Sequence, residues 1–185
     1  MNIQALITEC IKNKRSAQQQ LYNAYADTML TVCYRYTRNI HDAEDVLQIG
    51  FVKVFKNIAQ FNNQGELGAW IRRIMVNSSL DYIKKHSRYN KELVFEEINL
   101  HQVSTDNPDV KLLAQDIIEL IRELPFGYQT IFNLIGVEGY SHAEAAQMLN
   151  ISEQTSRSQY SRARASLIKQ IQQRSSKPEN FKNYV

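Results

Sequence analysis

Residues 141–164 read SHAEAAQMLNISEQTSRSQYSRAR, and this stretch predicts two short helices joined by a tight turn. Ser141 followed by Glu144 has the pattern of a capping box, which marks the start of the first helix. Asn150 suits the left-handed backbone conformation of a turn, and Ser152 is a good cap for the second helix. These signals agree on a helix-turn-helix.

The predicted second helix has two unlike faces. Its inward side should consist of Ser156, Tyr160, Ala163 and Leu167. The other side carries polar and basic side chains suited to phosphates and base edges in a major groove, where arginine can bond guanine in two places. These side chains are Gln154, Arg157, Ser158, Ser161 and Arg162. An ordinary amphipathic surface helix is the alternative, but capping, turn and polar face together favour DNA binding.

Length and composition predict an all-α protein with two small domains. The chain has 185 residues, of which 43% are hydrophobic, and it contains few Gly and Pro. Helical periodicity lapses before Pro108, in a stretch rich in turn residues. We therefore expect a first domain at 1–90, a flexible acidic linker at 91–108, a second domain at 109–173 and a tail at 174–185. The expected helices span 3–13, 17–38, 42–59, 67–86, 110–123, 127–137, 143–149 and 153–172.

Charge is arranged in blocks along the chain, although the formal net charge is only +3. Residues 70–91 and the residues after 151 are mainly basic, whereas residues 92–123 are mainly acidic. Two basic segments suit a protein that binds a polyanion at two places. Ordinary solvated faces would produce the same pattern, so charge alone does not separate the two interpretations.

Several classes of protein are disfavoured by the sequence. No apolar run is long enough to span a bilayer, and the N-terminus lacks the features of a signal peptide. Cys10 and Cys33 are too few for a disulfide framework or a zinc site, and four dispersed histidines with no Gly-rich phosphate loop give no sign of catalysis. We therefore expect a cytoplasmic protein that is not an enzyme, with no metal, no cofactor and no small-molecule substrate.

The helix expected from Asp42 has apolar residues outside its buried stripe. At about 100° per residue, the stripe consists of Ala43, Leu47, Phe51, Val54, Phe55 and Ile58. The opposite side carries Asp45, Gln48, Ile49, Val52 and Lys56. One interpretation is a docking surface anchored by Ile49 and Val52, with Asp45 and Gln48 fixing the register. The other is that a further helix of the same domain covers this side, and periodicity alone favours that simpler alternative.

The helix expected from Leu67 gathers an aromatic ring, an amide and two cations on one face. Trp70, Arg73, Asn77, Leu80 and Lys84 lie on this face, away from the predicted core side. Cations hold phosphate, an amide reads a base edge and an indole stacks on an unstacked base, so the set suits a single nucleic-acid strand. A core tryptophan beside a solvated basic face is the commoner outcome for such a pattern taken alone.

Taken together, these motifs resemble a bacterial RNA polymerase sigma factor of the small, two-domain extracytoplasmic-function (ECF) group. The segment from Asp42 to Gln48, with Phe51 and Phe55, is similar to the family's polymerase-binding helix. The segment from Phe61 to Asp81 is similar to its −10 recognition and melting region. Leu124-Pro125 and the helix-turn-helix ending at Arg164 are similar to its −35-binding domain.

The resemblance implies roles for the residues on these faces. Asp45, Gln48, Ile49, Val52 and Lys56 would contact core polymerase. Phe61, Trp70 and Asn77 would bracket a base flipped from the −10 element, with Arg73 and Lys84 on phosphates. The −35 element would be read by Gln154, Arg157, Ser158, Gln159, Ser161, Arg162 and Arg164.

Three positions depart from the family's usual pattern. Ile49 stands where an acid is frequent, so one polar contact to polymerase would become apolar. Ser156 replaces a usual valine, which should weaken packing of the recognition helix, and Gln159 replaces a frequent arginine, which should change promoter preference.

We therefore expect an initiation factor that binds core RNA polymerase and promoter DNA and helps to open the duplex. The resemblance also implies a membrane-linked anti-sigma factor as a further partner. The alternative is a stand-alone helix-turn-helix regulator that binds operator DNA without polymerase, its N-terminal helices sensing a ligand or dimerising.

Overall fold

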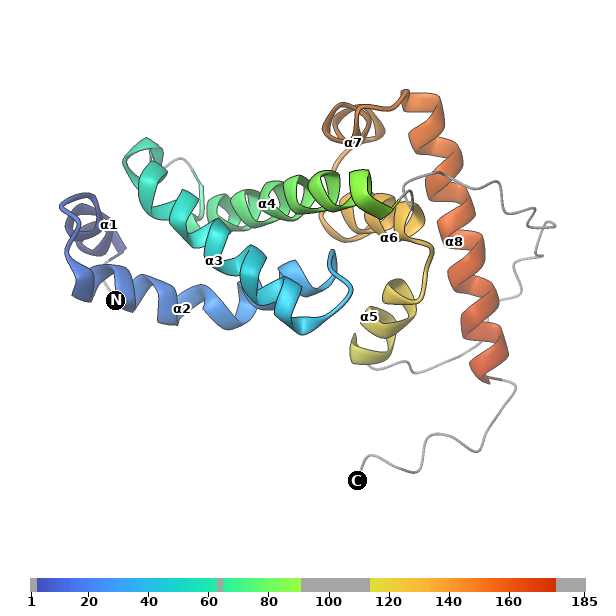
Figure 1. Cartoon of the computed structure of the whole chain (residues 1–185), viewed down its shortest axis with the longest axis horizontal. Coiled ribbons are helices and arrows are strands. Elements are labelled where there is room, and N and C mark those ends of the chain that lie inside the picture. The colour runs from blue at the N-terminus through green and yellow to red at the C-terminus, as the bar shows by residue number, and fades with distance from the viewer. Residues whose placement is uncertain (1–2, 63–64, 91–113, 176–185) are drawn as a thin grey trace. The chain divides into compact units, whose positions relative to one another are not determined.

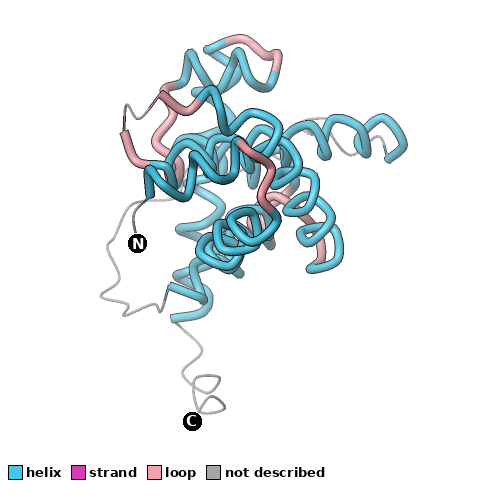
Figure 2. Tube along the Cα trace, turned by 90° about the vertical axis from the view of Figure 1, so that its left-hand side faces the viewer, coloured by secondary structure: helices cyan, strands magenta, loops and turns pink. Residues whose placement is uncertain are grey.

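The computed structural model describes residues 3–62, 65–90 and 114–175, and within them the chain forms helices and short connections without a strand (Figure 2). The chain divides into two compact units, Met1–Tyr89 and Asn90–Val185. The predicted all-α fold with two domains is confirmed. The linker expected at 91–108 lies outside the described residues, as do residues 176–185 of the expected tail.

The first unit contains the helices α1 (Ile3–Ile11), α2 (Arg15–Tyr34), α3 (Ile40–Asn57) and α4 (Leu67–Asn90), with the 3-10 turn η1 (Ile58–Gln60) after α3 (Figure 1). All four helices were predicted, with ends displaced by a few residues. Asn39 caps α3, because its side-chain oxygen accepts a hydrogen bond of 2.9 Å from the backbone N–H of Asp42.

Helix α3 lies at the centre of the first unit. Its buried side packs on α2, where the rings of Tyr22 and Phe51 have centroids 4.7 Å apart. The same side meets α4 at Gly50, where an added Cβ would lie 2.2 Å from the Sδ of Met75. Only a glycine fits this approach without displacing Met75, which is completely buried.

Polar contacts join α3 and α4 at the edges of this core. Lys53 Nζ donates to Asp81 Oδ2 over 2.8 Å. Burial, helped by a side-chain hydrogen bond to the Asp42 carboxylate, raises the pKa of the Tyr82 hydroxyl to about 12. Tyr82 therefore remains a neutral donor to the first turn of α3 at physiological pH.

Both cysteines are buried in the first unit and both are free thiols. Cys10 is 1% exposed and Cys33 is completely buried. Burial raises the pKa of the Cys10 thiol, and it raises the pKa of Cys33 to about 12. These thiols are therefore packing groups, held in their unreactive protonated form.

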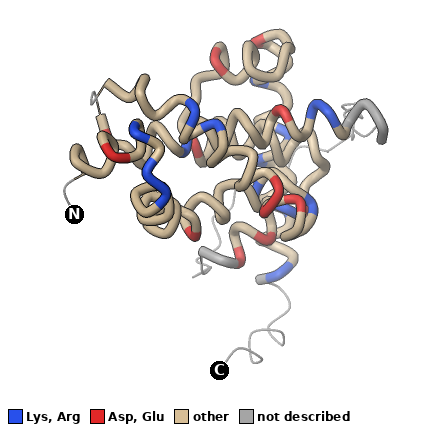
Figure 3. Tube along the Cα trace, turned by 60° about the vertical axis from the view of Figure 1, so that its left-hand side comes forward, with Lys and Arg blue, Asp and Glu red and all other residues tan. Residues whose placement is uncertain are grey.

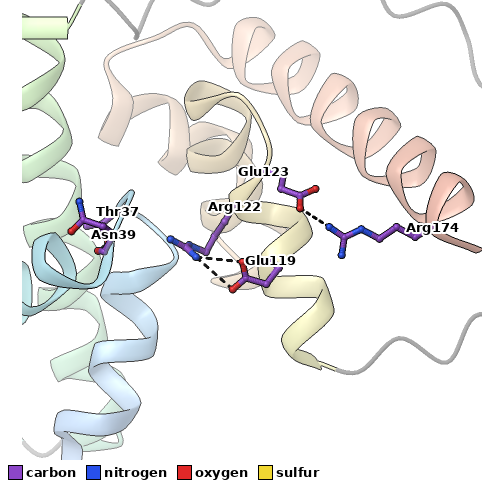
Figure 4. Close-up of polar contacts among 6 residues, drawn as sticks. All are labelled: Thr37, Asn39, Glu119, Arg122, Glu123 and Arg174. Atoms are coloured by element: carbon purple, nitrogen blue, oxygen red, sulfur yellow. Dashed lines mark hydrogen bonds and ion pairs between the residues drawn. The ribbon is translucent and has the colours of Figure 1, made fainter. Parts of the chain in front are cut away.

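The second unit contains α5 (Ala114–Arg122), α6 (Phe126–Phe132), the π-helical turn η2 (Asn133–Val137), α7 (His142–Leu149) and α8 (Glu153–Ser175). Helices α5, α6 and α7 all pack on the long helix α8. Arg174, expected in the tail, belongs to α8, and its Nη2 donates to Glu123 Oε1 over 2.5 Å (Figure 4). The segment predicted as one helix at 127–137 widens to a π-helical turn, closed by a 2.8 Å bond from the Glu138 N–H to the Asn133 carbonyl.

The local geometry predicted for the helix-turn-helix is confirmed. Ser141 and Glu144 form both bonds of the capping box at the start of α7. Asn150 adopts the left-handed conformation, with φ of 56° and ψ of 48°, and the Ser152 Oγ accepts a 3.0 Å bond from the Thr155 N–H. The turn is therefore fixed by the chain's own side chains and needs no ligand.

A polar contact links the two helices of the motif. His142 Nδ1, at the first residue of α7, lies 3.0 Å from the Oγ of Ser156 in α8. Ser156 is completely buried, and the His142 ring also meets the Tyr160 ring edge-on at a centroid distance of 5.7 Å. The weak packing predicted for Ser156 is therefore offset in part by an interhelical hydrogen bond.

Gly50→Val should destabilise the first unit by about 1–3 kcal/mol, because the added atoms overlap Met75, which is completely buried and must shift. Trp70 is the sole tryptophan and lies in this unit, so its fluorescence during urea unfolding measures the effect. When Gly50→Val is combined with Met75→Ala, the loss of unfolding free energy should be smaller than the sum of the two single losses. Strict additivity would show that this contact does not limit the approach of the helices.

Ser156→Ala should lower the stability of the second unit by about 1 kcal/mol, because it leaves the partly buried His142 nitrogen without its partner. The change should appear in far-UV circular dichroism while the Trp70 transition stays in place. His142→Asn, which presents a side-chain nitrogen near the position of Nδ1, is the matched conservative variant and should lose less. A more stable Ser156→Ala protein would mean that burying the hydroxyl costs more than its bond returns.

Candidate nucleic-acid and protein interfaces

The five residues predicted for protein docking share one exposed face of α3. We call Asp45, Gln48, Ile49, Val52 and Lys56 the α3 patch, and every one of them is exposed. Ile49 is 49% exposed and Val52 is 52% exposed, the highest values among the exposed large apolar side chains of the described residues. The alternative that another helix of the same unit covers this side is therefore wrong. The patch is open because the opposite side of α3 is occupied by α2 and α4.

Four of the residues predicted to meet a single strand line one face of α4. We call Trp70, Arg73, Asn77 and Lys84 the α4 track; Arg73, Asn77 and Lys84 are exposed and Trp70 is half-buried. From Trp70 to Lys84 the track rises about 21 Å along the helix. Leu80, predicted on this face, is instead 3% exposed and belongs to the core, because it lies at the edge where the face turns inward.

Phe61, predicted to help bracket a flipped base, is largely buried beside Trp70. It is 9% exposed, and its ring packs on Trp70 with centroids 5.7 Å apart and an interplanar angle of 57°. The Phe61 ring therefore packs against the half-buried indole of Trp70, and its contact with a base stays a prediction.

Six residues predicted to meet duplex DNA lie on the outward side of α8. We call Gln154, Arg157, Ser158, Ser161, Arg162 and Arg164 the recognition face; Arg162 is half-buried and the others are exposed. The Ser158 Oγ donates to the Thr155 carbonyl over 3.0 Å. Since the turn before Glu153 fixes where α8 begins, it also fixes which side chains of its first turns point away from the unit.

Gln159 is corrected from a DNA contact to an interior residue. It is 4% exposed, and its Oε1 has no hydrogen-bond partner among the described residues. On the helix wheel Gln159 falls beside Ser156 and Ala163, which are both completely buried. The resemblance assigned it by position in a motif, whereas its angle on the helix places it against the rest of the second unit.

One charged residue of this region was missed by the sequence reasoning. Glu153 accepts a 2.5 Å bond at Oε1 from Nη2 of Arg157, one helical turn later. The spacing of four residues between an acid and a following base is a known helical signal and would have predicted the contact. Glu153 therefore lies beside the recognition face, at the first residue of α8.

Basic residues outnumber acidic ones on both helices that carry the predicted DNA contacts. Figure 3 shows Lys and Arg along the chain, and residues 67–86 of α4 contain four of them against Asp81, whose carboxylate is paired with Lys53. Helix α8 contains five against Glu153, which is paired with Arg157. The excess of basic over acidic side chains on both helices gives a positive field suited to phosphates.

The described part of the chain contains neither a cluster suited to a metal ion nor a helix suited to cross a membrane. No group of His, Cys, Asp and Glu side chains there is arranged to hold a metal ion. None of the helices in that part is both long enough and apolar enough to cross a membrane.

Both units match known families. Residues 21–89 match the family described as Sigma-70 region 2, and residues 114–167 match that described as Sigma-70, region 4. The first match contains the α3 patch and the α4 track, and the second contains the helix-turn-helix. Together the matches cover roughly two thirds of the chain.

The similarity to known proteins extends over nearly the whole length of the chain. The ECF RNA polymerase sigma factor SigW of Bacillus subtilis is 29% identical, with 92% of this chain and 97% of that protein covered. The ECF RNA polymerase sigma-E factor of Haemophilus influenzae is 26% identical, over 91% of this chain and 95% of that one. A solved structure of the sigma factor RpoE with the anti-sigma factor NepR from Bartonella quintana has a similar fold, with a TM-score of 0.53 and 21% identity over 83% of this chain and 96% of that chain. The chain therefore belongs to the sigma-70 family of RNA polymerase sigma factors, in the ECF group.

Proposed function

We propose that the chain binds core RNA polymerase through the α3 patch and directs it to promoters. The observation that carries this proposal is the exposure of Ile49 and Val52, one turn apart and surrounded by the polar Asp45, Gln48 and Lys56. An apolar centre with a polar rim is the usual composition of a protein-binding surface. Nothing in the first unit covers it among the described residues, so a partner protein would gain the burial.

The α4 track is proposed to hold one separated strand of the −10 element. Trp70 would stack on an unpaired base, Asn77 would bond a base edge, and Arg73 and Lys84 would contact phosphates. Stacking of a base on an aromatic side chain is worth roughly 1–3 kcal/mol, which offsets part of the cost of opening a base pair. Phe61 would support this role, because its ring packs on the indole of Trp70.

The recognition face of α8 is proposed to read the −35 element in the major groove. Arg157 and Ser158 lie in its first two turns, the part of a recognition helix that usually meets base edges. Arg162 and Arg164 lie further along and are better placed for phosphates.

The proposed role requires no reaction by the chain itself, no cofactor and no small-molecule substrate. It places the protein in the cytoplasm, where core polymerase and promoter DNA are found. An anti-sigma factor is a further proposed partner, supported by the complex of the similar sigma factor RpoE with the anti-sigma factor NepR. That this partner is linked to the membrane is implied by the family resemblance alone. The alternative of a stand-alone regulator is not favoured, because the α3 patch would then serve no described purpose.

Gel filtration of the full chain with bacterial core RNA polymerase tests the proposal. We expect the chain and core polymerase to elute together. The mixture should transcribe from a promoter at which core polymerase alone does not initiate. If the chain stays separate from polymerase yet binds duplex DNA, the stand-alone regulator replaces the sigma factor.

Ile49→Glu combined with Val52→Glu should weaken polymerase binding at least a hundredfold, because both anchors of the α3 patch become charged in a surface that must lose water. Ile3→Glu with Ile11→Glu is the matched control: the two isoleucines are 43% and 46% exposed on α1 and receive the same charges. The control should keep full affinity, and both proteins should keep the helical content of the wild type. Equal losses in both would attribute the effect to added charge and remove the α3 patch from the interface.

Arg157→Ala should cost roughly 1–3 kcal/mol at a single −35 position and relax base preference there. Binding of the polymerase complex to duplexes carrying each base at each −35 position measures the effect. A uniform loss over all sequences would make Arg157 a phosphate contact.

A further inference from the structure

An acidic side chain beside a face proposed to bind DNA is unexpected, because it repels phosphate. Glu153 is the single acid of α8, and it lies at the helix's first residue, where a carboxylate also favours the helix dipole. Its Oε1 accepts from Arg157 Nη2 over 2.5 Å, and the two side chains are 47% and 63% exposed. At such exposure the ion pair adds little to stability. Its geometric effect is to draw the Arg157 guanidinium toward the first residue of α8.

Arg157 has enough N–H donors to bond Glu153 and a guanine base at the same time. A guanidinium has five N–H groups in a rigid plane, and the contact with Glu153 is made through one terminal nitrogen. The remaining edge still offers two parallel donors, the number that guanine O6 and N7 accept in the major groove. The contact with Glu153 restricts the directions in which this remaining edge points in the free chain.

The Glu153 carboxylate also disfavours contacts of Arg157 with phosphates and with incorrect bases. Without Glu153, the long side chain of Arg157 is free to turn toward the phosphates, which attract it on any sequence. Near the bases, a carboxylate is repelled by the acceptors of guanine and thymine and is compatible with the amino group of cytosine. It therefore penalises incorrect sequences more than the correct one, a form of specificity by repulsion.

We propose that Glu153 is a positioning residue for Arg157, and that it increases −35 sequence discrimination at the expense of affinity for DNA in general. This inference rests on the proposed function, since it presupposes that the recognition face meets a −35 element. Glu153 was not among the residues predicted to bind DNA, and its role here is to orient one that was.

The test uses the full chain assembled with core RNA polymerase and a library of duplexes randomised over the −35 element. For Glu153→Gln we expect preference at one base pair to fall roughly tenfold, together with tighter binding to unrelated DNA. The slope of log affinity against log salt for unrelated DNA should steepen by about one, because Arg157 gains a phosphate contact. Arg157→Ala should abolish preference at the same base pair, and adding Glu153→Gln to it should change that preference no further.

Two control variants separate this role from simpler ones. Glu119→Gln removes an equal charge from the same unit, where Glu119 accepts from Arg122 in α5, and it should leave base preference and salt slope unchanged (Figure 4). Glu153→Asp keeps the charge at the first turn but shortens the reach to Arg157, so it should lose preference without gaining general affinity. Unchanged preference in Glu153→Gln, with wild-type protein still selecting a −35 sequence, would overturn the inference. Failure of the wild type to select any sequence would instead contradict the proposed function.

Discussion

The packing of α3 against α2 and α4 is the constraint on which the first unit depends. Helix α3 buries one side completely, and the approach to α4 at Gly50 is so close that Met75 occupies the space of a missing side chain. Because a helix that is locked on one side can present only the other, this contact determines which residues of α3 stay in solvent. The exposure of Ile49 and Val52 is thus a consequence of the core, and the α4 track follows from the same packing on the neighbouring helix.

The second unit achieves the same result with polar contacts. A capping box, a left-handed asparagine and a serine cap determine where α7 ends and α8 begins. The His142–Ser156 hydrogen bond then joins the two helices across a buried position. Local hydrogen bonds therefore determine where α8 begins, and apolar packing of Ala163 and Leu167 determines which side of α8 faces inward.

The sequence predicted which helices form better than it predicted which residues at the boundary of each helix face are buried. Periodicity and capping signals were sufficient for the helices and the helix-turn-helix, because these depend on residues close in the chain. Whether Ile49 and Val52 were covered depended on the other helices, which periodicity does not report. Leu80 and Gln159 lie at the boundary between inward and outward sides, where a small rotation of the helix decides burial. The contact of Phe61 with Trp70 was not predicted, because the two residues are nine positions apart and the contact is tertiary.

The burial of both thiols has a practical consequence for studying this protein. Neither Cys10 nor Cys33 offers a thiolate to an alkylating reagent or to an oxidant, since each is enclosed and each has a raised pKa. We therefore expect maleimide dyes to leave both native thiols of the folded chain unlabelled. A single cysteine introduced near the α3 patch or at the end of α8 would accept one label selectively, without removal of the native pair.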